Sequence, residues 1–76
     1  MNKERRKMLQ KAYDMLDTAK QIIEDTAEME QDAFDNLPEG LQASDRGAQL
    51  EENSYNLGEA ADAVASAMEL VEGAME

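Results

Sequence analysis

Apolar residues recur along the first half of the chain at alternating steps of four and three. The row runs from residue 8 to residue 33, and no glycine or proline interrupts it. This spacing keeps side chains on one face of a helix and is typical of coiled coils and helix bundles. It predicts a first helix over about residues 2–35. The row consists of Met8, Ala12, Met15, Ala19, Ile22, Thr26, Met29 and Ala33.

The same spacing returns in the second half of the chain and predicts a second helix over about residues 45–75. A line of small residues, Ala60, Ala67 and Ala74, runs beside this second row. Small side chains let two helices approach closely, so this half favours tight helix–helix packing. The second row consists of Leu50, Ser54, Leu57, Ala61, Val64, Met68, Val71 and Met75.

A hinge over residues 36–44 separates the two helices. Pro38 lacks a backbone donor and should end the first helix just before it, and Gly40 can adopt a positive φ. Ser44 or Asp45 should cap the second helix. The chain is therefore expected to form one all-α domain, residues 1–76, folded as an antiparallel two-helix hairpin. A register with Met8 opposite Met75 sets small residues against larger ones in several layers.

The hinge sequence also resembles a known group of proteins. The string Asn36-Leu37-Pro38-Glu39-Gly40-Leu41-Gln42, followed by Ser44, Arg46 and Gly47, is similar to small helical proteins of phages and prophages in Firmicutes. The resemblance covers about residues 33–60. It implies a helical hairpin and a mobile-element origin, and it assigns no functional residue.

The apolar stripe of the first helix is wider than a two-helix seam requires. Leu9, Leu16 and Ile23, spaced by seven, flank the first row, and the facing positions of the second helix include Gly58 and Ala65. We expect these five residues to form a dimer or partner interface. A second copy packed there would give a homodimeric four-helix bundle. A partner chain would also support a core that is small in a chain of this length and that no disulfide can reinforce.

Charge is distributed unevenly. Residues 1–11 carry a net charge of +4, whereas the other 65 residues carry −15, for a total of −11. An acidic body repels nucleic acid and anionic membranes but suits a basic protein partner. The alternative is a face that only confers solubility. An antiparallel hairpin would also bring the basic N-terminal segment beside the acidic C-terminal end. The possible acidic partner face consists of Glu24, Asp25, Glu28 and Asp32.

No residue set for catalysis or for a cofactor is recognisable. The chain has no histidine and no cysteine, which removes the commonest general base and the usual transition-metal ligands. No serine has a histidine partner, and no glycine-rich phosphate loop is present. We therefore expect a protein that is not an enzyme and holds neither metal nor cofactor. The chain also lacks a membrane-spanning run and a signal-peptide pattern, which predicts the cytoplasm.

Three functions fit these observations. The first is a protein-binding module, such as a phage inhibitor or adaptor of a host protein. The second is a DNA mimic whose carboxylates imitate phosphates, and the third is a structural subunit of a larger assembly. The methionines can form an adaptable binding surface, although methionine at this spacing more often belongs to a core. The three aromatic residues, Tyr13, Phe34 and Tyr55, either anchor a partner or complete the core.

Overall fold

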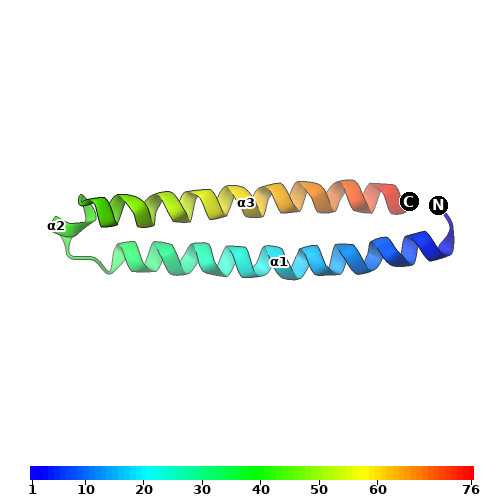
Figure 1. Ribbon diagram of the computed structural model, residues 1–76, viewed down its shortest axis with the longest axis horizontal. Coiled ribbons are helices and arrows are strands. Elements are labelled where there is room, and N and C mark those ends of the chain that lie inside the picture. The colour runs from blue at the N-terminus through cyan, green and yellow to red at the C-terminus, as the bar shows by residue number, and fades with distance from the viewer.

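The computed structural model describes residues 1–76 and shows a long helical hairpin (Figure 1). Helix α1 spans Lys3–Asp35, the short helix α2 spans Glu39–Gln42, and helix α3 spans Asp45–Met75. Helices α1 and α3 lie antiparallel along a rod of 59 × 14 × 12 Å, and both termini lie at the same end. The predicted all-α hairpin is confirmed.

Side-chain caps define where the two long helices begin. The Asn2 side chain accepts a hydrogen bond from the Arg5 backbone N–H at 2.8 Å, and the Ser44 hydroxyl accepts one from the Gly47 N–H at 3.4 Å. Each cap satisfies a backbone donor that has no partner within the helix. Ser44, one of the two predicted caps, is therefore the N-cap of α3.

The hinge contains a short helix, α2, that the sequence did not predict. Gly40 lies in this helix and does not use the positive φ that glycine allows. The Gln42 side-chain amide donates to the carbonyls of Phe34 and Leu37, both at 3.3 Å, and so ties the hinge to the end of α1. Gly47, in the first turn of α3, packs directly against the Gln42 backbone.

The predicted row of α3 is its packing seam. All three buried apolar residues of the chain, Leu50, Ala61 and Met68, belong to this row. The remaining members are half-buried. A row that follows steps of four and three down one helix can stay against a neighbouring helix for the whole length of the hairpin.

The predicted seam of α1 is wrong by one residue. Met8, Met15, Ile22 and Met29 are 60 to 69% exposed, and no residue of α1 is fully buried. The half-buried positions follow the same spacing one residue further along and form the α1 seam: Leu9, Tyr13, Leu16, Lys20, Ile23, Ala27, Glu30 and Phe34.

The predicted register along the hairpin axis agrees with the hydrogen bonds between the helices. Asn53 Nδ2 donates to Glu30 Oε2 at 3.1 Å, and the Ser54 hydroxyl donates to the Ala27 carbonyl at 3.2 Å. These partners lie within one helical turn of the predicted layers. The error is therefore a rotation of α1 about its own axis, by the angle of about 100° that separates consecutive residues, and not a shift along it.

Two glycines of α3 provide a matched test of this packing. A Cβ on Gly47 would overlap the Gln42 carbonyl group, whereas a Cβ on Gly58 would meet no atom within 4 Å. We expect Gly47→Ala to lower the free energy of unfolding by about 1–3 kcal/mol through overpacking. Gly58→Ala should raise it by up to about 1 kcal/mol through helix propensity. Urea denaturation followed by circular dichroism measures both, and equal effects of the two substitutions would contradict the described hinge contact.

Candidate docking surface

The row of eight residues from Met8 to Ala33, which the sequence predicted as the seam of α1, lies on the surface of this helix. We call it the outer row. Six of its members are exposed, and only Ala12 and Ala33 are half-buried. Its larger residues recur every seventh position, and smaller ones lie between them. This alternation of large and small residues is the pattern by which side chains of two helices interdigitate.

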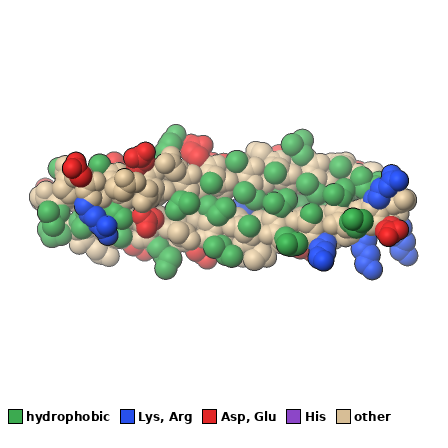
Figure 2. Space-filling view, viewed as in Figure 1, with side chains coloured by type: hydrophobic (Ala, Val, Ile, Leu, Met, Phe, Trp, Pro, Cys, Tyr) green, Lys and Arg blue, Asp and Glu red, His purple; other side chains and the backbone are tan.

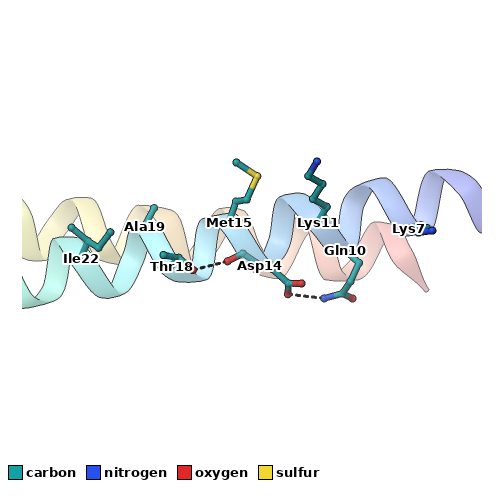
Figure 3. Close-up of a pocket in the computed structure, with 8 residues that line it drawn as sticks. All are labelled: Lys7, Gln10, Lys11, Asp14, Met15, Thr18, Ala19 and Ile22. Atoms are coloured by element: carbon teal, nitrogen blue, oxygen red, sulfur yellow. Dashed lines mark hydrogen bonds between the residues drawn. The ribbon is translucent and has the colours of Figure 1, made fainter.

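A shallow groove of about 650 Å³ follows the N-terminal half of the outer row (Figure 3). Met15 and Lys11 project away from the two helices, while Ile22 and Ala19 continue the apolar lining. Its polar edge is held in place by Asp14. The Asp14 carboxylate accepts from Gln10 Nε2 at 2.9 Å, and its backbone carbonyl accepts from the Thr18 hydroxyl at 3.2 Å.

Helix α3 contributes small residues to the same side of the hairpin. A second groove is lined by Thr26 of the outer row and by Asn53 and Asn56 of α3, which places these positions on one side. Further along α3, the heptad equivalents of Asn53 and Asn56 form what we call the alanine row. Its members are half-buried or exposed, and Leu70 is 77% exposed. The alanine row consists of Ala60, Ala63, Ala67, Leu70 and Ala74.

The outer row and the alanine row together form the apolar face. They run beside each other because the N-terminal half of α1 packs along the C-terminal half of α3 (Figure 1). Figure 2 shows one side of the rod, on which hydrophobic side chains follow the line between the helices toward the end that holds the termini. Basic side chains gather at that end in the same view.

The structure separates the residues that the sequence grouped into one interface. Leu9, Leu16 and Ile23 belong to the α1 seam and are half-buried beside α3. Gly58 lines a groove with Glu24 on the opposite side of the hairpin from Thr26. Ala65, one heptad further on, shares the position of Gly58. The five residues of the predicted interface therefore do not share one exposed surface: the three from α1 lie in the seam, and the two from α3 lie on the side opposite Thr26.

The acidic residues remain on the surface. Glu24, Asp25, Glu28 and Asp32 are all exposed, and no acidic group in the structure is arranged to hold a metal ion. The single ion pair joins Lys20 and Glu24 at 3.5 Å within α1. The charge of the four acidic residues therefore acts more on approaching molecules than on the stability of the fold, because exposed charges interact only weakly with each other in water.

The contact that joins the two chain termini is not the expected pairing of the basic N-terminal segment with acidic side chains of the C-terminal end. Arg6 Nε donates to the Met75 backbone carbonyl at 2.8 Å, while no carboxylate of the C-terminal end forms an ion pair. A cation placed at the C-terminus of a helix interacts favourably with its dipole and satisfies a free carbonyl. The N-terminal segment therefore caps α3.

The aromatic residues lie in two different settings. Phe34 and Tyr13 are half-buried in the α1 seam, whereas Tyr55 is 67% exposed. Glu72 of α3 raises the pKa of Tyr13 above the ordinary value of 10.0, first by hydrogen bonding to the phenol and then by its charge. Glu59 raises the pKa of Tyr55 in the same way within α3. Tyr13 thus interacts with a residue of α3, and Tyr55 interacts with a residue of its own helix.

No protein family, no curated protein and no solved structure matches this chain. Neither long helix contains an apolar stretch of the length and low charge that a membrane crossing requires. The surface of the hairpin is therefore the basis on which a function can be inferred.

The contact between Tyr13 and Glu72 can be followed by titration. In a Tyr55→Phe background, the ultraviolet absorbance of phenolate should give a midpoint above 10.0 for Tyr13. Glu72→Gln should move that midpoint back toward 10.0. Because the pKa of Tyr13 is raised only in the folded state, its interaction with Glu72 stabilises the fold fully below pH 10. This contribution to the free energy of unfolding is lost as the pH rises through the raised pKa. A midpoint that Glu72→Gln leaves unchanged would contradict the contact.

Proposed function

We propose that this chain is a non-enzymatic, acidic helical module that binds proteins through the outer row of α1. The observation that carries the proposal is a row of eight heptad-spaced positions, seven of them apolar, of which the hairpin leaves six exposed. Soluble proteins seldom expose contiguous apolar surface of this kind unless it meets a partner. The spacing of the row favours a helix of a partner protein over a flat surface.

The composition of the outer row supports the same proposal. Three of its four large residues are methionines, whose unbranched thioether side chains adapt to the shape of a partner. Methionine was expected at these positions as part of a core, but Met8, Met15 and Met29 are exposed. Exposure favours the alternative, an adaptable binding surface.

The charge of the chain argues for protein over other partners. A net charge of −11 repels nucleic acid and anionic membranes. At the groove, Lys7 and Lys11 lie near Asp14, so the edge of the apolar surface offers both signs of charge. Mixed charges around an apolar centre are the usual arrangement of protein interfaces.

The resemblance of the hinge to phage and prophage proteins extends the proposal to an inhibitor or adaptor of a host protein. Mimicry of DNA would use the exposed carboxylates of α1 and would leave the outer row without a role. For that reason we place the docking surface on the outer row and treat mimicry as the alternative that the experiment must separate.

Site-specific photocrosslinking tests this function. A photoreactive amino acid at Met15, in cells that produce the chain, should give a light-dependent protein adduct. The same group at Ser66, an exposed position outside the outer row, should give none. Because apolar contacts weaken little with salt, the Met15 adduct should persist at high ionic strength.

The identity and salt dependence of the adduct decide between the alternatives. A Met15 adduct with any protein, a second copy of this chain included, supports the docking surface. The photoreactive amino acid is also placed at Asp25. An adduct that forms only from position 25 and disappears at high salt would support DNA mimicry instead. Absence of an adduct from both position 15 and position 25 would contradict protein binding through α1.

A further inference from the structure

The charges along α1 change sign between its two ends. Lys7 and Lys11 flank the outer row near the N-terminus, and Asp25 and Asp32 flank it near the hinge. None of these four residues has an ion-pair partner within the hairpin. A surface with this polarity is complementary to itself when one copy is reversed end to end, because each basic segment then lies beside an acidic one.

We propose that the occupant of the apolar face is a second copy of this chain, packed face to face and antiparallel about a twofold axis near Ala19. This inference rests on the proposed function, because it names the partner of the same surface. The product is a four-helix bundle in which the α1 helices of the two copies pair with each other, as do the two α3 helices.

The outer row fits this symmetry along its length. With the axis near Ala19, Met15 lies beside Ile22 of the partner subunit, and Met8 lies beside Met29 of the partner subunit. The smaller residues then also meet each other, with Ala19 near its own copy and Ala12 near Thr26 of the partner subunit, so that layers of larger and smaller residues alternate along the contact. The half-buried Leu9, Leu16 and Ile23 border this contact, and the second copy covers their remaining exposed surface.

The alanine row of α3 fits the same axis. The cross-helix hydrogen bonds of the hairpin place Ala19 at the level of Val64. An axis at that level brings Ala63 beside Ala67 of the partner subunit, and Leu70 beside Ala60 of the partner subunit. The most exposed large residue of α3 thus meets one of the small residues that leave room for it. Small residues on both copies let the two α3 helices approach closely.

The charges select the antiparallel orientation. Around the axis near Ala19, Lys11 lies beside Asp25 of the partner subunit, and the symmetry repeats this pair on the other side. A parallel arrangement would instead place the acidic middle and hinge regions of the two copies against each other. Like charges in contact disfavour that orientation.

The footprint of the hairpin along the outer row reaches the lower size limit of specific protein interfaces. From Met8 to Met29 the outer row extends about 32 Å at 1.5 Å per residue, and two helices of about 10 Å diameter give a width of about 20 Å. The face therefore measures roughly 600 Å² per copy, or about 1,200 Å² for both copies. This total reaches the lower bound of specific protein interfaces.

The first experiment measures the mass of the purified chain by light scattering during size-exclusion chromatography. We expect twice the 8.4 kDa of one chain, at low and at high salt. Met15→Glu combined with Ile22→Glu should give a helical monomer, because both side chains are exposed in the hairpin and their change does not disturb its seam. Gly58→Ala, on the opposite side of α3, should leave the dimer intact.

A charge exchange tests the pairing of the two copies. Lys11→Glu or Asp25→Lys alone should raise the dissociation constant of the dimer about tenfold, since each removes two symmetric contacts and adds repulsion. The two substitutions together should restore it to within about threefold. Asp62→Lys, a control with the same change in net charge as Asp25→Lys but on the opposite side of the hairpin, should not weaken the dimer.

Spin labels distinguish the antiparallel dimer from the parallel one. The chain has no cysteine, so single cysteines can be labelled at Ala19 and at Met8. In the antiparallel dimer the backbones at position 19 lie about 10 Å apart, and those at position 8 lie about 30 Å apart along the axis. Equal short distances at both positions would overturn the proposed orientation.

The outcomes separate this inference from the proposed function. A monomer at all concentrations, with a Met15 crosslink to a different protein, would overturn the dimer and leave the docking surface standing. A monomer without any Met15 crosslink would overturn both. A dimer that survives Met15→Glu with Ile22→Glu would place the interface elsewhere and overturn the inference.

Discussion

Two helices in a hairpin can share only one seam along their length, and this constraint governs the structure. Helix α1 carries two rows with heptad spacing, offset by one residue and therefore by about 100° around the helix. When the row that begins at Leu9 faces α3, the row that begins at Met8 must face outward. The exposed surface of this protein thus follows from the choice between two competing rows.

The half-buried row of α1 that faces α3 is the more polar of the two rows, and its polar members find partners at the edges of the seam. Lys20 pairs with Glu24, Glu30 accepts a hydrogen bond from Asn53, and Tyr13 lies beside Glu72. Satisfied groups at a seam edge cost little, whereas unsatisfied buried ones would cost several kcal/mol. The resulting core is nevertheless thin, since its three buried apolar residues all come from α3. A chain that covers the outer row would add the apolar burial that the hairpin lacks.

Acidic residues and apolar residues occupy different faces of the rod. The acids are spread over the outer faces, while the apolar face offers the contact that burial can stabilise. The basic N-terminal segment interacts with the C-terminal end of α3 through Arg6 and also supplies the cations at one end of the outer row. One short segment therefore serves both the fold and the polarity of the proposed interface.

The sequence by itself determined the helices, the position of the hinge, the capping residue Ser44 and the seam of α3. These features depend on local chemistry and periodicity, which a single chain displays directly. The sequence also contained both rows of α1, and the more apolar one was selected as the core. Only the tertiary structure decided between them. The contacts of Tyr13, Lys20 and Glu30 with residues of α3 or the neighbouring turn make a polar row tolerable in the seam, and periodicity cannot reveal such partners. The same contacts turned an expected core into the surface through which this protein is proposed to bind.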